Sequence, residues 1–412
     1  MNMRLLTVAM LASVALSAVS AQATDLEVTH WWTSGGEAAA VKEFAKAFDA
    51  TGNHWVDGAI AGSGDTARPI MISRITGGKP MAATQFNHGR QAEELVQAGL
   101  MRDLDDVATK ENWKAVINPP SLLEGCTVDG KIYCVPVNIH AWQWLWLSNA
   151  AFEKAGVAVP KNWDEFVAAG PALQKAGILP LALGQQSWQV TGLFNNLLLA
   201  QGGKDLYLKV YQDKDAKAAA GPEMAKIFKA ADDARKLAKG SNVQDWNQAT
   251  NLVITGKAGA QSMGDWAQGE FQVANQVAGK DYTCLVDLGA ADPYISTGGD
   301  SIYFPKLADA DQSKAQEVLA SVMMSPSAQL AFNLKKGSMP VRGDVDLTSA
   351  NDCMKKGLAV LKKGNVVKST DELITPDTTT QLNNLMTQFF NDASITPESA
   401  QKSYAEIIGS AD

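Results

Sequence analysis

The sequence is poor in the side chains from which metal centres and catalytic triads are usually built. It contains only four histidines, His30, His54, His88 and His140, and none follows position 140. Because no CxxC or HxxxH spacing occurs, we predict no metal site. The G-x-S-x-G, P-loop and G-x-G-x-x-G signatures are also missing, so the sequence predicts neither a cofactor nor a catalytic residue.

Positive charge is also in short supply. Lys and Arg together number 36 against 44 Asp and Glu, which gives a formal net charge of −8 at pH 7. A nucleic-acid surface needs clustered Lys and Arg, so we predict no nucleic-acid partner. The 412 residues, 46% of them hydrophobic and 19% charged, are typical of a globular protein with about two domains.

Long hydrophobic runs are confined to the N-terminus. A short segment ending in Arg4 precedes an uninterrupted run of small and apolar residues, 5–18, and Ala21-Gln22-Ala23 follows. This pattern predicts a secretory signal peptide over residues 1–23, cleaved after Ala23 or alternatively after Ala21. No Cys follows the apolar run as a site for a lipid anchor, and no later run approaches the roughly 20 residues of a membrane span.

Only four cysteines are present, and the predicted export places them in an oxidising compartment. An even count predicts two disulfides, for which four cysteines allow about three pairings. Cys126 and Cys134 flank the turn 129–131 at equal spacing about Gly130, which would place them opposite each other on a hairpin. We therefore predict a Cys126–Cys134 bridge and, by elimination, a Cys284–Cys353 bridge.

The chain begins with the order of elements that is typical of an α/β domain. Residues 26–32 alternate as a strand, 33–36 form a loop, and 37–50 have the spacing of an amphipathic helix. Further helices are predicted over 66–76, 92–98, 162–176, 190–200, 222–239, 312–324, 328–334, 350–363 and 378–391. Further strands are predicted over 81–86, 131–137, 142–148, 259–263 and 283–288.

Two short segments interrupt these regular elements, and we interpret them as crossings between domains. They are residues 135–140 and 292–299, the latter containing Pro293, Gly298 and Gly299. The prediction is an α/β protein with two lobes, each a mixed sheet flanked by helices, joined by a hinge of several strands that permits closure. The lobes would be non-contiguous: 24–137 with about 291–340, and 138–290 with about 341–412.

Tryptophan is abundant, with eleven residues against seven tyrosines. Adjacent residues of a strand point to opposite faces, so one of Trp31 and Trp32 can pack while the other faces outward at the carboxyl end, where α/β sheets bind ligands. An aromatic face suits the apolar face of a pyranose. For each Trp taken singly, core packing is the alternative. Several others also stand near expected loops: Trp142, Trp144, Trp188 and Trp266.

Polar residues accompany these tryptophans. Glu37 opens the first helix, Gln85 and Asn87 end a strand two residues apart, and Asp300 and Lys336 stand at other element ends. These side chains can hydrogen-bond sugar hydroxyls. A carboxylate at a helix start and a Lys at a helix end are also explained by the helix dipole alone, which remains the alternative for Glu37 and Lys336.

An enzymatic alternative stays open at this point. Glu37 and Asp300 would be the carboxylate pair of a glycoside-acting enzyme if they lay at the required separation. Of the histidines, His88 and His140 are the ones expected to face a cleft. We treat the histidines as structural in the absence of triad spacing.

Four segments together resemble a known family. They are HWWTSGGE at 30–37, DGKIY at 129–133 leading to VPVNIH at 135–140, WLW at 144–146, and FNLKKGSMPVR at 332–342. They are similar to the periplasmic solute-binding proteins of ABC-type sugar importers, the family 1 extracellular solute-binding proteins, and most of all to the glucose-binding branch. The resemblance covers most of the mature chain and implies a two-lobed fold that holds a sugar in its cleft without covalent chemistry.

The resemblance also implies roles for individual residues. Trp32 and Trp266 match the pair that sandwiches the pyranose, with Trp31 at the edge of the site. The polar residues that match the ligand-binding positions are Glu37, Asp300 and Lys336, and we add Gln85, Asn87 and His140 from their positions in the sequence.

The sequence departs from the glucose-binding branch at two places. Asn87 stands where Lys or His is usual, and residues 366–374 lack the late His of that branch. We therefore expect a glucose-like hexose or a related aldose, delivered to inner-membrane ABC permease subunits by a periplasmic, monomeric protein. The alternatives are a secreted glycoside-acting enzyme and a binder of another small polyol or glycoside.

Overall fold

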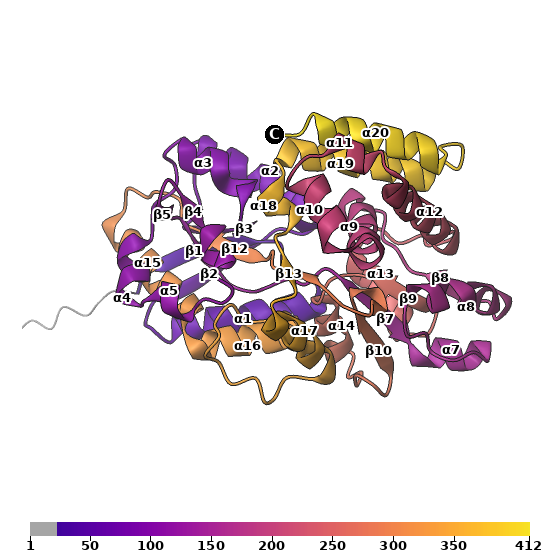
Figure 1. Cartoon of the computed structure of the whole chain (residues 1–412). Coiled ribbons are helices and arrows are strands. Elements are labelled where there is room, and N and C mark those ends of the chain that lie inside the picture. Colours follow the sequence, from indigo (N-terminus) through magenta and orange to yellow (C-terminus); the bar gives the residue numbers. More distant parts are fainter. Residues whose placement is uncertain (1–22) are drawn as a thin grey trace, which may run out of the picture.

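The computed structural model describes residues 23–412, so all of the predicted signal peptide (1–23) except Ala23 lies outside the described residues. Two mixed sheets organise the molecule (Figure 1). The first has the order β2-β1-β3-β12-β6, in which β1 is parallel to β2 and β3 while β12 is antiparallel to β3 and β6. Its strands are β1 (Asp25–His30), β2 (His54–Ala59), β3 (Ala83–Asn87), β6 (Cys134–Pro136) and β12 (Asp300–Tyr303).

The second sheet has the order β10-β7-β9-β8, with β7 antiparallel to both neighbours and β8 parallel to β9. Its strands are β7 (Trp144–Ser148), β8 (Leu179–Leu181), β9 (Ala258–Ser262) and β10 (Tyr282–Val286). Two short pairs complete the strands: β4 (Thr127–Val128) with β5 (Lys131–Ile132), and β11 (Ile295–Ser296) with β13 (Val366–Val367). One apolar cluster packs on the first sheet and extends to Trp144 and Trp146 of the second, and another packs around Leu145 and Leu147 on the other face of β7. The two-lobed α/β prediction is confirmed.

Helices cover both sheets (Figure 1). Between the strands of the first sheet lie α1 (Gly35–Asp49), α2 (Ser63–Thr76), η1 (Arg90–Ala92), α3 (Glu93–Gln97), α4 (Asp105–Lys110), α5 (Trp113–Val116) and α6 (Ser121–Glu124), and after β12 come α15 (Ala310–Met324) and α16 (Pro326–Lys336).

The remaining helices follow the second sheet. They are α7 (Asn149–Ala155), α8 (Trp163–Lys175), α9 (Ser187–Leu197), η2 (Leu198–Gly202), α10 (Gly203–Tyr211), α11 (Ala216–Ala219), α12 (Pro222–Leu237), α13 (Trp246–Ile254), α14 (Ala267–Val273), η3 (Asp287–Gly289), α17 (Asp352–Lys363), α18 (Thr370–Leu373), α19 (Pro376–Asn391) and α20 (Pro397–Gly409).

Several boundaries differ from the sequence prediction. The strand predicted over 131–137 is two strands, β5 and β6, in different sheets. The strand predicted over 142–148 begins only at Trp144, and the one predicted over 283–288 ends at Val286 because Asp287 and Leu288 adopt positive φ angles of 48° and 52°. Strand β2 was missed, because a largely exposed edge strand lacks a regular apolar alternation.

Both predicted disulfides are confirmed. The Cα atoms are 5.1 Å apart in Cys126–Cys134 and 6.0 Å apart in Cys284–Cys353. The first bridge closes the β4–β5 hairpin, whose turn residues Asp129 and Gly130 both have positive φ, 49° and 78°. That pair of angles is the one a tight two-residue hairpin turn requires, which explains the Asp-Gly sequence.

Three backbone segments pass between the two sheets and lie side by side. The chain leaves the first sheet after β6 and enters the second at β7, and it returns between β10 and β12. The amide of His140 donates to the carbonyl of Gly298 at 2.7 Å, and the amide of Ile139 donates to that of Met339 at 2.8 Å. The expected crossings at 135–140 and 292–299 are thus joined by a third near residue 339.

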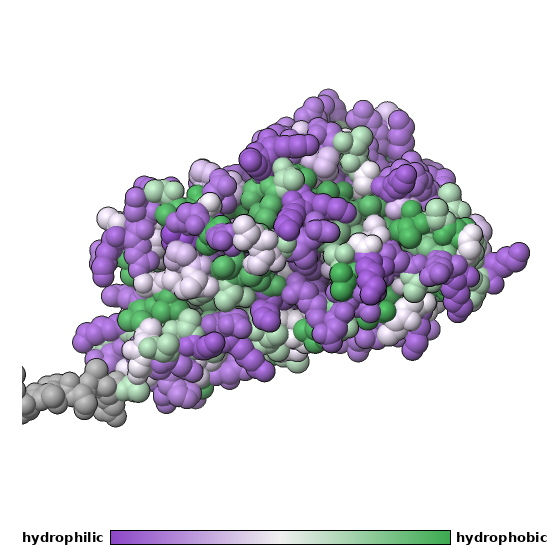
Figure 2. Space-filling model, turned by 90° about the horizontal axis from the view of Figure 1, so that it is seen from below, coloured by the Kyte–Doolittle hydropathy of each residue, from purple (hydrophilic) through white to green (hydrophobic). Residues whose placement is uncertain are grey.

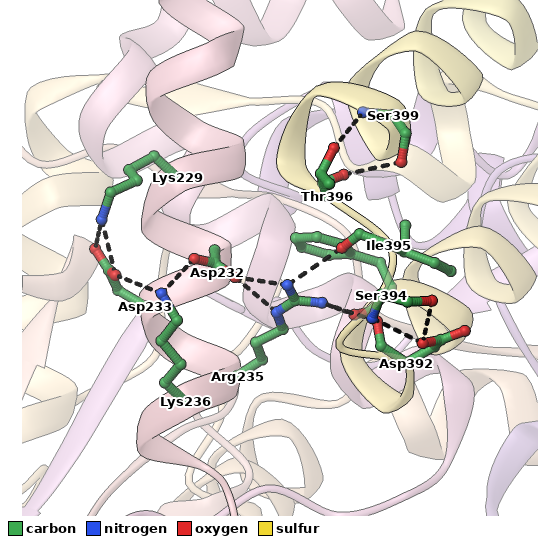
Figure 3. Close-up of polar contacts among 11 residues, drawn as sticks. Lys229, Asp232, Asp233, Arg235, Lys236, Asp392, Ser394, Ile395, Thr396 and Ser399 are labelled. Atoms are coloured by element: carbon green, nitrogen blue, oxygen red, sulfur yellow. Dashed lines mark hydrogen bonds and ion pairs between the residues drawn. The ribbon is translucent and has the colours of Figure 1, made fainter.

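The last helices are tied to the second sheet through α12 (Figure 3). The Arg235 guanidinium contacts the Asp232 carboxylate at 2.7 Å and donates to the carbonyls of Phe389, Asp392 and Ile395 around the α19–α20 turn. It also lies 4.3 Å from the centroid of the Phe389 ring. This one side chain satisfies the carbonyls at the end of α19 and holds that helix in position beside α9.

On the face of the molecule seen in Figure 2, small hydrophobic patches alternate with hydrophilic residues. In the described part of the chain, the exposed large apolar side chains lie on β2, on α2, at the end of α14 and in the loop after it: Val56, Ile70, Ile72, Val273 and Val277. Among residues 23–412, no helix has the length and apolar character needed to cross a bilayer.

Candidate functional site

A cavity of about 470 Å³ lies between the two sheets, within the range of about 300–1,000 Å³ that is typical of small-molecule sites. Elements that follow the first sheet and elements that follow the second both contribute to its wall. Of the residues expected from the sequence, the following line it: Trp31, Glu37, Asn87, His140, Trp266, Asp300 and Lys336. Trp32 and Gln85 are not among the lining residues.

A buried ion pair forms one part of the wall. The Lys336 ammonium lies 2.7 Å from Oε1 of Glu37, and both side chains are almost fully buried. Glu37 belongs to the capping box of α1, in which Ser34 Oγ accepts from the Glu37 amide. Lys336 ends α16, where Gly337 adopts the left-handed conformation (φ 90°) that closes the helix. Two helix ends therefore bring these opposite charges together at the cavity.

Asp300 is the most heavily hydrogen-bonded carboxylate at the cavity. Its Oδ1 accepts from Gln85 Nε2 at 2.7 Å, and its Oδ2 accepts from Trp32 Nε1 at 3.0 Å and from Asn138 Nδ2 at 2.9 Å. The His140 ring lies 3.1 Å from the same Oδ2. Burial alone would raise the pKa of Asp300, but attraction to His140 and Lys336 and these hydrogen bonds hold it well below its usual range.

The structure corrects the expected position of Trp32. Its side chain is 1% exposed, stacks on His30 with ring centroids 5.4 Å apart, and packs against Phe332. Trp31 lines the cavity instead, because consecutive residues at the end of β1 point to opposite sides. Trp32 and Gln85 thus act behind the cavity wall, where each donates a hydrogen bond to Asp300.

An aromatic cluster adjoins these polar groups at the cavity wall. The Trp266 ring centroid lies 4.8 Å from those of His140 and Trp142, 6.3 Å from that of Trp188 and 6.4 Å from that of Trp246. All five side chains line the cavity. A Cβ at Gly264 would overlap the Trp266 ring, so the Gly before Asp265-Trp266 makes room for that ring.

Some lining residues were missed by sequence reasoning. Trp246 is the first residue of α13, after a capping box at Asp245, and it lines the cavity. The only signal in the sequence for a role in the site was that it is a tryptophan. Asp371, in the short helix α18, accepts from Asn87 Nδ2 at 2.7 Å and from Gln91 Nε2 at 3.2 Å. In the sequence, the segment around Asp371 was notable only for its lack of a histidine. The contact with Asn87 joins positions 284 residues apart, so no local pattern predicts it.

The outer part of the cavity lies between α2, α9 and α19. Arg68 pairs with Asp65 at 2.8 Å, and its guanidinium carbon is 5.8 Å from the Trp31 ring centroid. Ser187 Oγ of α9 lies 3.4 Å from Asp65 Oδ2 of α2, so the two sides approach each other here. From α19 the lining residues are Pro376, Thr379, Thr380, Asn383 and Asn384.

No group of three or more His, Cys, Asp or Glu residues within 23–412 has the geometry of a metal site. The polar groups at the cavity instead combine carboxylates, amides and a lysine with several indole rings. This arrangement suits a ligand with many hydroxyls and an apolar face, which is the chemistry of a sugar ring.

Comparison with known proteins identifies the family. Residues 32–329 match the family model described as bacterial extracellular solute-binding protein. The chain belongs to this family. It is 38% identical over 359 residues, 87% of this chain and 84% of the relative, to a protein of Brucella melitensis named "Probable sugar-binding periplasmic protein".

Solved structures show the same fold as this solute-binding protein. The bacterial solute receptor AcbH, described as preferring β-D-galactopyranose, has a TM-score of 0.75 at 22% identity and covers 93% of this chain and 98% of its own. A maltose-bound protein of T. maritima has a TM-score of 0.74 at 18% identity, with 94% and 99% covered. Members of this family capture solutes and are not enzymes, in agreement with the sequence expectation.

Proposed function

We propose that this protein is the periplasmic sugar-binding component of an ABC importer. The observation that carries the proposal is the cavity itself, in which two carboxylates and a lysine lie beside a tryptophan cluster. The name of the Brucella melitensis relative supports the same ligand class and the same compartment. The captured sugar would pass to inner-membrane permease subunits.

The ligand we propose is a neutral monosaccharide, a glucose-like hexose or a related aldose. Trp266 would stack on its apolar face, with Trp31 at the edge. Glu37, Asp300 and Lys336 would bind hydroxyls through charge-assisted hydrogen bonds, and Asn87 and His140 would add further hydrogen bonds. Trp32 and Gln85 would orient Asp300 rather than touch the sugar.

We propose that the lobes are residues 24–137 with about 291–340, and 138–290 with about 341–412. The sheet order supports this division, since β12 returns to the first sheet and α15 and α16 pack on α1 before the chain leaves again. Three adjacent crossing segments form a hinge that permits closure on the ligand. We propose that the protein acts as a monomer.

The carboxylates do not favour the enzymatic alternative. A glycosidase needs one acid whose pKa is raised so that it stays protonated, whereas the pKa of Asp300 is held well below its usual range. Glu37 is engaged by Lys336. Neither group is therefore placed as a proton donor for bond cleavage.

A thermal-unfolding panel tests the proposal. The purified mature protein is mixed with D-glucose, D-galactose, D-xylose, D-mannose and maltose, and the unfolding temperature is measured. A sugar at about 100 times its Kd adds about 2.7 kcal/mol to the stability of the native state, so a clear upward shift is expected. Absence of a shift with every sugar would overturn the proposal, and recovery of a chemically altered sugar would point to catalysis.

A further inference from the structure

Asp371 is a carboxylate at the cavity for which the proposed function gives no role. It lies in α18, a single turn between β13 and α19 that begins with a capping box formed by Ser369 and Glu372. Leu373 and Ile374, which follow it, pack in the core of the second sheet. Asp371 is half-buried and lines the cavity, so its carboxylate is held at the wall by a short, capped element.

Two amides from the other side of the cavity hold the Asp371 carboxylate. Asn87 Nδ2 donates to Oδ2 at 2.7 Å, and Gln91 Nε2 donates to Oδ1 at 3.2 Å. The Gln91 side chain is itself fixed, because its Oε1 accepts from the Asn87 amide at 3.0 Å. An ionised carboxylate has about four acceptor sites, so these two bonds orient the group and leave acceptor capacity for a ligand.

Asp371 also differs from the other lining carboxylates in its charge environment. Glu37 pairs with Lys336, Asp65 pairs with Arg68, and Asp300 lies beside His140. Within residues 23–412, no Lys, Arg or His lies within ion-pair distance of Asp371, whose partners are neutral amides. Its negative charge is therefore uncompensated where it meets the cavity.

We propose that Asp371 is a ligand-binding residue that determines specificity. It accepts a hydrogen bond from a sugar hydroxyl, and its uncompensated charge repels sugars that carry a carboxylate or phosphate near it. Asn87 and Gln91 are positioning residues that fix the carboxylate. This inference rests on the proposed function. It gives a physical reason for the preference for neutral sugars and adds the requirement of a hydroxyl at this wall.

The test compares Asp371→Asn with a charge-matched control, Asp377→Asn. Asp377 is exposed at the start of α19, bonds only to Gln381 within the described chain, and does not line the cavity. Isothermal titration measures the binding of D-glucose, D-galactose and D-xylose, and of D-glucuronate and D-galacturonate, to the wild type and both variants.

The wild type is expected to bind at least one neutral sugar and to prefer it over its uronate. Asp371→Asn is expected to lower the affinity for that neutral sugar by about tenfold, because a hydrogen bond to a charged group is lost. It is also expected to raise the ratio of uronate affinity to neutral-sugar affinity by about tenfold, because the repulsion of the uronate carboxylate is lost. Asp377→Asn is expected to match the wild type in both quantities.

The outcomes separate the inference from the proposed function. If the wild type binds none of the sugars, the proposed function fails and the inference with it. If the wild type binds a neutral sugar but Asp371→Asn has the same ratio of uronate affinity to neutral-sugar affinity, the specificity role is overturned. This holds even if the variant binds all the sugars more weakly by the same factor. A wild-type preference for a uronate would also overturn it.

A second variant keeps the test decisive if Asp371→Asn does not fold. Gln91→Ala removes one donor from the carboxylate without changing the charge of the wall. A smaller loss of neutral-sugar affinity is expected, with altered preference among the three neutral sugars. Unchanged affinity and unchanged preference in Gln91→Ala would then overturn the inference.

Discussion

At the scale of single residues, most of the charged side chains at the cavity are matched in pairs, with Asp371 the exception argued above. Lys336 and Glu37 are both buried and satisfy each other, with the ammonium also 6.0 Å from the Trp266 ring centroid. A buried pair of this kind adds little to the net stability of the protein. Neither partner can be replaced alone without a large loss of stability, because the other would be left as an unpaired charge in the interior.

Replacing one partner of this pair should therefore destabilise the protein. Lys336→Met leaves Glu37 buried without its cation and is expected to cost about 3–5 kcal/mol of unfolding free energy. The double variant Glu37→Gln with Lys336→Met should recover much of that loss, since no buried charge remains. Denaturant unfolding of the ligand-free variants measures both, and a double variant no more stable than the single one would contradict this reasoning.

Trp266 should carry much of the binding energy. Its ring meets four other aromatic rings of the cavity wall. Trp266→Ala is expected to lower the affinity for the best-bound sugar by more than about tenfold, or about 1.4 kcal/mol of binding free energy, because the stacking surface is lost. Trp266→Phe, which keeps an aromatic face, should lose less. Titration calorimetry measures both, and wild-type binding by Trp266→Ala would remove the assigned role.

At the scale of elements, the connection between β10 and β12 contains Asp287, a buried carboxyl group whose pKa is shifted in the opposite direction to that of Asp300. Asp287 opens η3 with a positive φ of 48°, and its Oδ2 accepts from the Tyr294 amide at 2.8 Å. Its amide in turn donates to the carbonyl of Gln143, in the crossing that leads to β7. Burial raises the pKa of Asp287 to about 7, although the Tyr294 amide lowers it in part.

This pKa predicts a specific pH dependence of stability. The native state holds the Asp287 proton more tightly than the unfolded chain, whose pKa is near the ordinary 3.8. The resulting stabilisation is present below that value and is lost as pH rises through about 7. Relative to Asp287→Asn, the advantage of the wild type in unfolding temperature should therefore be greatest at about pH 4, decline as the pH rises, and be lost by about pH 8.

The control for this prediction is Asp311→Asn, at an exposed position in the first turn of α15. Its unfolding temperature should run parallel to that of the wild type across the same pH range. If the Asp287→Asn curve also ran parallel to the wild type, Asp287 would not titrate in this range, and the burial argument would be wrong.

At the scale of the whole molecule, two lobes are held in one arrangement by contacts on both sides of the cavity. Asp65 meets Ser187 at the outer edge, the Gly36 amide donates to Glu270 at 2.7 Å, and Asn87 meets Asp371. The Cys284–Cys353 bridge spans 69 residues, and this loop contains β12, α15 and α16, which belong to the first sheet and its helices. That disulfide therefore closes the excursion of the chain into the other lobe.

The two disulfides should contribute unequally to stability. In the chain-entropy account, a loop of 69 residues corresponds to roughly 4 kcal/mol and a loop of 8 residues to roughly 2.5 kcal/mol. Cys284→Ser with Cys353→Ser is thus expected to lower the unfolding free energy more than Cys126→Ser with Cys134→Ser. Denaturant unfolding of the two double variants tests the order, and the reverse order would show that local packing outweighs loop closure.

The sequence by itself determined the features that depend on local order along the chain. Alternation and helical spacing predicted most strands and helices, and the turn at Gly130 predicted the first disulfide. Most of the predicted site residues line the cavity because they stand at element ends, which a two-lobed α/β fold gathers at one place. Their roles in binding a sugar remain proposals.

Only the tertiary structure decided which side chains face the cavity and which charges are compensated. Trp31 and Trp32 are adjacent in sequence, and the environment of Phe332, about 300 residues away, decides which of them is buried. Asp371 meets Asn87 across 284 positions, so no local pattern could reveal it. Such contacts arise from packing between segments that are distant in the sequence. Periodicity predicts which residues share a face of a helix or strand, but not which other element packs against that face.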